Sequence, residues 1–172
     1  MKKMTHLLAG LCLGLILLPQ AEDSRATAAA VTGALTDAAA EEKARNFFTD
    51  LEVIDQNGKK LRFYSDVLKG RVVLISFIFT NCEFACPMQA QKLKQARAMM
   101  VPSIKDEVWY VTLSVDPERD TPEAMNKFAA RQGVDESRWI FLTGEKKNLE
   151  FLIKKLGQYT PDIESHTTLM LA

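Results

Sequence analysis

Two cysteines one helical turn apart are the residues of this sequence best suited to chemistry. The stretch TNCEFACP, residues 80–87, places Cys82 and Cys86 directly after an apolar run at 71–79. On a helix this spacing puts the side-chain origins roughly 5–6 Å apart, so the pair can close a disulfide after a small loop adjustment. It can also hold one metal ion between two thiolates. Both reactions need thiolate, and the positive end of the following helix is expected to lower the thiol pKa.

A structural disulfide is the alternative interpretation of the same pair in an oxidising compartment. A bridge across so short a loop restricts the unfolded chain little, which weakens this alternative. The location at the carboxyl end of a strand, where open α/β sheets bind ligands, favours a chemical role. From the pair alone, both interpretations stay open.

His166 is the third candidate ligand. The chain has three cysteines and two histidines, but Cys12 and His6 fall in an N-terminal leader, so the folded part keeps Cys82, Cys86 and His166. Two thiolates and one imidazole form a soft ligand set suited to Cu(I), and with a further oxygen ligand the set could hold Cu(II). A closed structural zinc site would want a fourth ligand.

Other candidate residues are given structural interpretations. The methionines at 88, 99, 100, 125 and 170 are expected to be core filler rather than thioether ligands. The charged stretch 116–120 is interpreted as a capped, salt-bridged loop, with partner docking as the alternative.

The first 30 residues have the layout of a secretory signal peptide or an uncleaved N-terminal anchor. Lys2 and Lys3 precede an apolar run at 7–18, which Pro19 ends. The run is shorter than the ~20 residues that span a bilayer comfortably. We therefore expect an exported, periplasmic protein, soluble or anchored to the inner membrane, with an Ala-rich spacer at 31–45 and one domain at 46–172.

Alternating strand and helix patterns position the candidate residues. Asn57-Gly58 predicts a hairpin within 46–64. Strands are predicted at 71–79, 108–115, 139–142 and from 167 to 171, with the first of them central and buried on both faces. Helices are predicted at 86–100, from 121 onward and at 145–156, the first with Leu93, Ala96 and Met100 on its apolar face. The fold class is α/β, a mostly parallel sheet flanked by helices with an N-terminal β-hairpin. Because the last strand stops at Ala172, we expect the C-terminal end of the fold to be missing.

Composition excludes several classes of protein. With 22 basic and 22 acidic residues the formal net charge is zero, which argues against a nucleic-acid partner. A sequence 47% hydrophobic and 26% charged is neither disordered throughout nor wholly embedded in membrane. We expect a monomer that recognises its partner through a local surface.

Taken together, these stretches resemble the Sco/SenC family of thioredoxin-like copper proteins that serve cytochrome c oxidase assembly. The resemblance covers about residues 48–172 and rests on 77–82, Cys86-Pro87, 113–122 with VDPERDTP, FLTG at 141–144, and His166. It implies a thioredoxin-like fold and copper bound by Cys82, Cys86 and His166. It also implies copper delivery to the dinuclear copper site of oxidase subunit II, or maintenance of that site's cysteines. Two positions depart from the family pattern: Glu83 stands where proline is common, and Ser165 stands where aspartate is common.

Two other functions remain open. One is a thiol–disulfide reductase of an exported metalloprotein, with Cys82 as the nucleophile. The other is a redox or copper sensor that binds another protein. The sequence lacks the proline that a typical thioredoxin enzyme carries near the position of His166, which favours a metallochaperone over an oxidoreductase and leaves enzymatic activity undecided.

Overall fold

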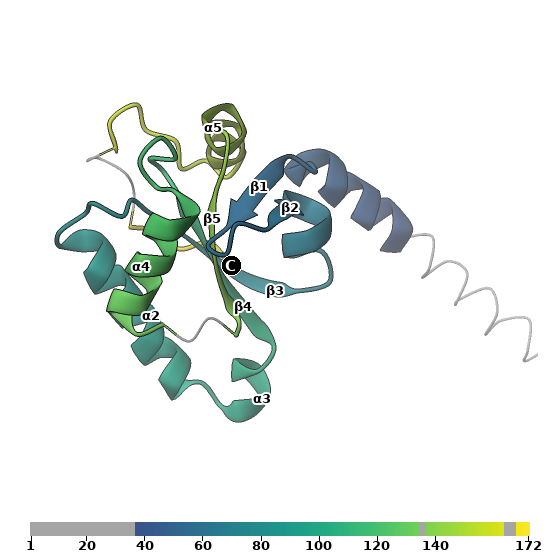
Figure 1. The fold of residues 1–172 in the computed structure, drawn as a ribbon. Helices are drawn as coiled ribbons and strands as arrows, with labels where there is room; N and C mark the ends of the chain where they lie inside the picture. The colour runs from purple at the N-terminus through teal and green to yellow at the C-terminus, as the bar shows by residue number, and fades with distance from the viewer. Residues whose placement is uncertain (1–36, 135–136, 164–167) are drawn as a thin grey trace, which may run out of the picture. The chain divides into compact units, whose positions relative to one another are not determined.

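A mixed five-stranded sheet organises the described part of the chain, which comprises residues 37–134, 137–163 and 168–172 of a computed structural model (Figure 1). The strand order is β2-β1-β5-β4-β3. Strands β3, β4 and β5 run parallel, whereas β1 is antiparallel to both β2 and β5. The strands are β1 (Glu52–Asp55), β2 (Lys60–Arg62), β3 (Val72–Ile78), β4 (Val108–Ser114) and β5 (Trp139–Thr143). The predicted fold class, including the N-terminal hairpin, is confirmed.

Helices lie in the connections between these strands, before β1 and after β5. They are a helix at residues 37–48, one wide turn of π-helix η1 (Phe63–Leu68), α2 (Ala85–Met99), α3 (Pro102–Lys105), α4 (Pro122–Gln132) and α5 (Lys146–Lys155). Contacts divide the chain into two units, Met1–Ala39 and Ala40–Ala172, and the sheet belongs to the second. Within the described ranges no helix is both long and apolar enough to cross a membrane. The predicted leader at 1–30, with His6 and Cys12, lies outside the described residues.

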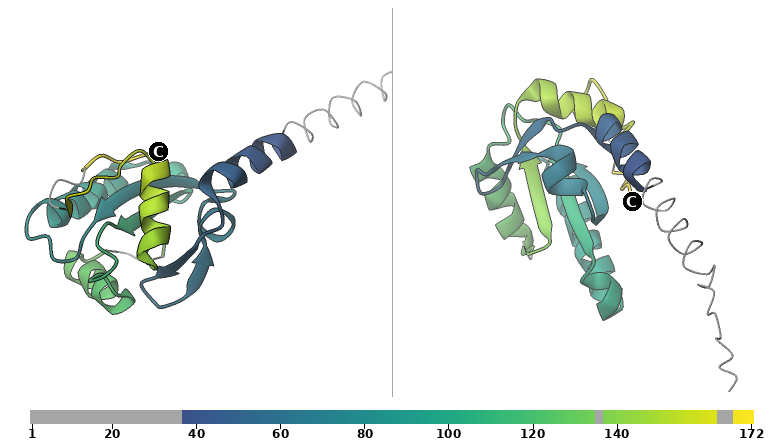
Figure 2. Two further views of the ribbon diagram at one scale, coloured as in Figure 1. Left: turned by 90° about the horizontal axis from the view of Figure 1, so that it is seen from above. Right: turned by 90° about the vertical axis from the view of Figure 1, so that its right-hand side faces the viewer.

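The core of the second unit forms two apolar layers, one on each face of the sheet. Figure 2 shows the ribbons of the sheet and of the helices around it. On β4, Val111 and Leu113 face η1 and α5, whereas Val108 and Tyr110 face α2 and α4. This alternation is the period of two that an extended strand imposes on its side chains. The layer under α2 and α4 is the one that contains Cys86.

Strand β3 differs from its prediction in position and burial. It lies at one end of the described sheet rather than at the centre, and Val72 is 59% exposed. Only its second half, from Ile75 on, is buried. On its outer side Leu171 forms an antiparallel bridge with Ile75, with backbone N–O distances of 2.7 and 3.0 Å. An apolar run therefore identified the strand but not its place in the sheet.

Helix α2 buries a different face from the predicted one. Cys86, Ala90 and Leu93 are buried together with Gln89, whereas Ala96 is exposed. The prediction was wrong because it took its phase from Ala96 and Met100 instead of from Cys86, whose side chain enters the core.

The core-filler interpretation of the methionines holds for Met125, which is fully buried. It is wrong for Met88, Met99 and Met170, which are 54%, 85% and 45% exposed. These three lie on the outer face of α2 or in the last described segment, where the apolar layers do not reach.

The hairpin and the two later helices match their predictions. Gly58 adopts a φ of 81° and donates its N–H to the Asp55 carbonyl at 2.9 Å, as the tight turn requires. Thr121 caps α4 by accepting the Ala124 N–H at 3.2 Å. The predicted apolar stripes of α4 and α5 are buried, through Met125, Phe128 and Ala129 in one and Leu149, Leu152 and Ile153 in the other.

Candidate metal centre

The carboxyl ends of the parallel strands meet at one edge of the sheet. The ladder between β3 and β4 closes with the Val115 N–H donating to the Ile78 carbonyl at 2.8 Å. Beyond that bond the chain leaves both strands, into loop 79–84 on one side and loop 115–121 on the other. Ligands of open α/β sheets bind at such edges, so any groups that these loops carry are well placed for chemistry.

Loop 79–84 and the first turn of α2 bring the two cysteines together. The Cys82 N–H donates to the Phe79 carbonyl at 3.2 Å, which closes a tight turn. The Cys86 N–H donates to the Cys82 sulfur at 3.2 Å. Cys82 is partly exposed on the loop, Cys86 is 1% exposed at the start of the helix, and neither forms a disulfide. The site thus combines one accessible thiol with one buried thiol.

Burial dominates the electrostatics of the inner thiol. It raises the pKa of Cys86 to about 12, and the hydrogen bond with the Cys82 side chain adds to the rise. The negative charges of Cys82 and Asp120 act in the same direction, and a backbone hydrogen bond with Phe79 opposes them. The expectation that the thiol pKa is lowered is therefore wrong for Cys86, because burial disfavours the charged thiolate.

The third sequence-predicted ligand, His166, lies outside the described residues. Two residues further on, the carbonyl of Thr168 accepts a 3.0 Å hydrogen bond from the Gln89 side chain. Gln89 follows Cys86 by three positions on the buried face of α2, so residue 168 lies against the helix that carries Cys86. In the ranges that the structure describes, no group of three or more His, Cys, Asp or Glu side chains could hold a metal. The described donors are two soft sulfurs, which suit Cu(I) as a bound cargo.

Three polar side chains tie the two loops together: Thr80 and Ser114, which the sequence analysis gave no separate role, and Asp120, which it interpreted only as part of the charged stretch 116–120. Asp120 is 1% exposed and accepts hydrogen bonds from the Thr80 N–H, the Thr80 hydroxyl and the Ser114 hydroxyl, at 2.9, 2.6 and 2.5 Å. Burial raises the pKa of Asp120, and the hydrogen bonds from Ser114 and Thr80 oppose the rise. One sequence feature could have revealed this group: Thr80 and Ser114 stand at the carboxyl ends of two buried strands that follow each other in the chain.

The rest of loop 115–121 agrees with the salt-bridged interpretation. Arg119 lies 3.5 Å from the buried carboxylate of Asp116, and Lys146 on α5 lies 2.9 Å from Glu118. Both ion pairs involve well exposed basic side chains, so each contributes little stability. Asp120 departs from this interpretation, since it is buried and its carboxylate accepts hydrogen bonds from Thr80 and Ser114 instead of forming an ion pair.

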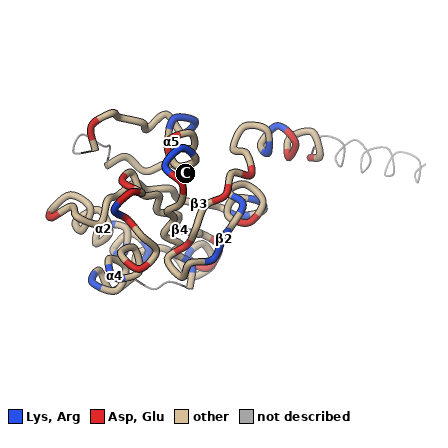
Figure 3. The backbone as a smooth tube through the Cα atoms, turned by 45° about the horizontal axis from the view of Figure 1, so that its top comes forward, with Lys and Arg blue, Asp and Glu red and all other residues tan. Residues whose placement is uncertain are grey.

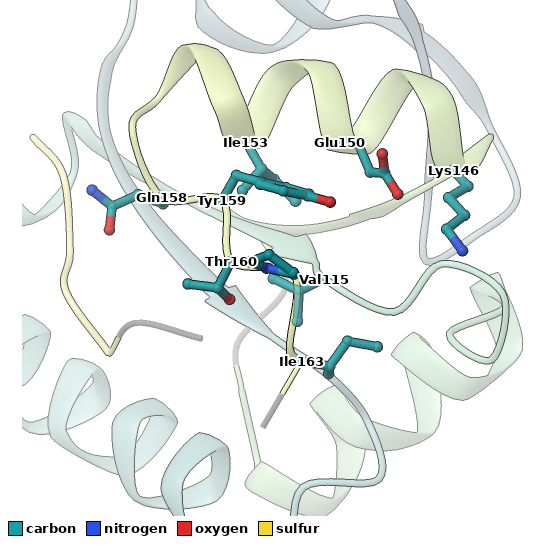
Figure 4. A pocket seen from close by; sticks show the side chains of 9 residues that line it. Val115, Lys146, Glu150, Ile153, Gln158, Tyr159, Thr160 and Ile163 are labelled. Carbon is teal, nitrogen blue, oxygen red and sulfur yellow. The ribbon is translucent and has the colours of Figure 1, made fainter. Parts of the chain in front are cut away.

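A separate pocket of about 220 Å³ lies beside this edge, beneath the segment 158–163 (Figure 4). Helix α5 contributes Lys146, Glu150 and Ile153 to its lining, and Val115 closes it from β4's end. Ile163 lines the pocket and also packs against the apolar layer that Cys82 contacts. Neither cysteine lines this pocket, so it borders the candidate metal centre without being part of it.

Comparison with known proteins identifies the family. The chain matches the SCO1/SenC family model over residues 39–169. The SCO1 protein homolog of Bacillus subtilis is 40% identical over 103 residues, which are 58% of this chain and 51% of that protein. The chain spans about half the length of the curated relatives it matches.

Comparison with solved structures identifies the same family. Bradyrhizobium japonicum ScoI with copper bound is 30% identical at a TM-score of 0.57, covering 69% of this chain and 77% of that one. BsSco, a member of the Sco family of cytochrome c oxidase assembly proteins in which a disulfide switch was identified, is 34% identical at 0.54, covering 63% and 62%. A SCO1/SenC family lipoprotein from Bacillus anthracis is 33% identical at 0.53, covering 63% of each chain. The predicted thioredoxin-like fold and family are confirmed: this chain belongs to the SCO1/SenC family.

Proposed function

We propose that this chain is a copper-binding chaperone in which Cys82, Cys86 and His166 hold one copper ion, as Cu(I) or Cu(II). The observation that carries the proposal is the contact between two cysteines, outside any disulfide, at the ligand-binding edge of the sheet in a member of the SCO1/SenC family. Two adjacent sulfurs favour Cu(I), and an imidazole would complete a three-coordinate set. The contact of Thr168 with α2 supports an approach to this helix of the chain next to His166, two residues before Thr168.

The acceptor in this proposal is a metalloprotein, specifically the dinuclear copper site of cytochrome c oxidase subunit II. Support comes from BsSco, which belongs to a family of cytochrome c oxidase assembly proteins. Acidic and basic residues are interspersed along the described chain rather than gathered on one element (Figure 3). Recognition of the acceptor would therefore rest on local shape around loops 79–84 and 115–121 more than on a broad electrostatic field.

We place the protein outside the cytoplasm, held at a membrane through its N-terminal segment. The basic start and the apolar run at 7–18 support export. The similar Bacillus anthracis protein is a lipoprotein, which supports a membrane-held location for this chain too. The periplasm is the compartment we propose.

Copper titration of the fully reduced chain tests the proposal. Anaerobic competition against a colorimetric Cu(I) chelator should give one bound copper, and Cys82→Ser or Cys86→Ser should lose that copper to the chelator while still taking up Cu(I) when no chelator competes. His166→Ala should weaken affinity by more than the roughly 10–100-fold that loss of an outer-shell partner costs. His6→Ala is the matched control, because it removes the chain's other histidine and should leave affinity unchanged. Equal effects of the two histidine variants, or copper retained without both cysteines, would contradict the proposal.

A second function, reduction of the acceptor's disulfide, is favoured by the unequal exposure of the two thiols. An accessible Cys82 can attack a partner disulfide, and the buried Cys86 can then resolve the mixed disulfide, leaving the partner's two thiols reduced and this chain oxidised. Cys82→Ser should abolish reduction of a disulfide-bonded acceptor peptide, whereas His166→Ala should leave most of it. Activity that survives Cys82→Ser would exclude this function.

A further inference from the structure

We propose that Asp120 is a positioning residue that sets the place of Cys82 by holding the turn on which Cys82 stands. The two carboxylate oxygens divide their partners between the strands. One accepts both the N–H and the hydroxyl of Thr80, just after β3, and the other accepts the hydroxyl of Ser114, the last residue of β4. Asp120 thus joins the exits of two neighbouring strands, although it lies 40 residues from Thr80 in the sequence.

The residue that Asp120 holds is the second of the turn that delivers the outer thiol. The turn runs from Phe79 to Cys82 and is closed by the Cys82 N–H on the Phe79 carbonyl. Thr80 is fixed through both its backbone and its side chain, so the turn has little freedom to rotate about its first peptide. At the other end of the turn the Cys82 sulfur accepts the Cys86 N–H. A continuous series of hydrogen bonds therefore runs from Asp120 through the turn to the start of α2.

Asp120 is itself firmly placed. Its N–H donates to the Asp116 carbonyl at 2.9 Å, and the Asp116 N–H donates to the Ser114 hydroxyl at 3.0 Å. A carboxylate buried to this degree is costly unless donors surround it, and here three donors converge on it. An acidic residue that served only to make the surface soluble would not need these buried hydrogen bonds. Nor is Asp120 needed as the cap of α4, since Thr121 already caps that helix.

The consequence concerns how readily the two thiols react with each other. Oxidation by glutathione disulfide forms one bond between the Cys82 and Cys86 sulfurs and breaks the glutathione S–S bond. Two electrons pass to glutathione, and the two thiol protons end on its two released thiols. A turn that holds Cys82 against α2 raises the effective concentration of one thiol at the other, which favours the oxidised form. The inference rests on the proposed function only in taking Cys82 and Cys86 as the reactive groups of the site.

Redox equilibrium with glutathione tests this role without copper. In the full chain, Asp120→Ala should lower the equilibrium constant for oxidation by at least about tenfold, the scale of losing hydrogen bonds to a charged group. Asp120→Asn can still accept both Thr80 bonds and should stay within about threefold of the parent. Thr121→Ala, next to Asp120, removes only the α4 cap, so it should lower the unfolding temperature and leave the equilibrium constant unchanged.

The conservative variant separates position from charge. If Asp120→Asn and Asp120→Ala shift the equilibrium constant equally, the charge matters and the positioning role is wrong. An unchanged constant in Asp120→Ala overturns the proposal outright. Should Asp120→Ala fail to fold, Thr80→Val removes only the hydroxyl contact and should still lower the constant by more than Thr121→Ala does. Because glutathione is the probe, failure here leaves the copper proposal standing, and failure to bind copper leaves this one standing.

Discussion

Two polar hydrogen-bond networks link β3 to β4, and they have different roles. Inside the sheet, the Thr112 hydroxyl lies 2.9 Å from the Ser76 hydroxyl and accepts the indole N–H of Trp139 at 2.8 Å. At the carboxyl edge, Asp120 joins Thr80 to Ser114. The first network is neutral and fully buried, whereas the second is built on a carboxylate and leads to a thiol.

The difference shows how this fold separates stability from chemistry. Loss of the interior network should lower the free energy of unfolding and leave the cysteines alone. Loss of the edge network should change how the cysteines react. Cys86 belongs to the interior and Cys82 to the edge, so the two thiols of one site should differ strongly in reactivity.

The largest expected effect is the difference in reactivity between the two cysteines. In a Cys82→Ser variant the contributions of Cys82 are gone, but burial, the largest cause, still holds the pKa of Cys86 above its ordinary value of 9.0, so its thiolate fraction near pH 8 stays well below that of an exposed thiol. Alkylation by iodoacetamide, followed by mass spectrometry, should be correspondingly slow. Its rate should keep rising about tenfold per pH unit above pH 9 instead of levelling off. Cys86→Ser is the matched control, and a plateau near pH 9 in Cys82→Ser would contradict the burial argument.

The same shift has a consequence for stability against pH. The folded chain keeps the Cys86 proton to a higher pH than the unfolded chain does, so between about pH 9 and 12 the folded state binds more protons. The stabilisation is therefore fully present below pH 9 and is lost as the pH rises toward 12. Urea unfolding of the reduced chain at pH 8 and pH 10 should show a smaller decrease in Cys86→Ser than in the parent.

An intermediate effect is expected from the interior network. Thr112→Val keeps the shape of the side chain but leaves the Trp139 N–H and the Ser76 hydroxyl without their partner, at a cost of about 1–3 kcal/mol in the free energy of unfolding. Urea unfolding measures this loss. The glutathione equilibrium of the folded variant should match the parent, and a shift as large as that of Asp120→Ala would break the distinction between the two networks.

The smallest effect is expected at the outer ion pair between Lys146 and Glu118. Both side chains are more than half exposed, so Lys146→Ala should change the free energy of unfolding by about 0–1 kcal/mol. Neither the thiol equilibrium nor copper affinity should respond. A clear response of copper affinity would extend the functional edge to α5 and the neighbouring pocket.

Sequence patterns predicted the elements of this fold better than their surroundings. Hydrophobic runs and the Thr121-Pro122 start located β3, β4 and α4 because local composition determines those features. The same patterns misjudged the exposure of Val72 and Met99, since exposure depends on which neighbours cover an element.

For the candidate site too, the sequence predicted the residues better than their surroundings. Cys82 and Cys86 were identifiable from their spacing alone, and the structure brings them into contact. The raised pKa of Cys86 was not foreseen, because it follows from burial in a layer that other elements build. Asp120 looked like one more charge in a polar loop, and its partner Thr80 lies 40 positions away. Parallel pairing of β3 with β4 is what brings those two together.

The measurement that most directly tests the central claim is X-ray absorption at the copper edge on the full chain loaded with Cu(I). We predict two sulfur donors and one nitrogen donor, loss of one sulfur in Cys82→Ser and loss of the nitrogen in His166→Ala. Copper surrounded only by nitrogen and oxygen, or a spectrum that neither substitution changes, would contradict a copper site built on these residues.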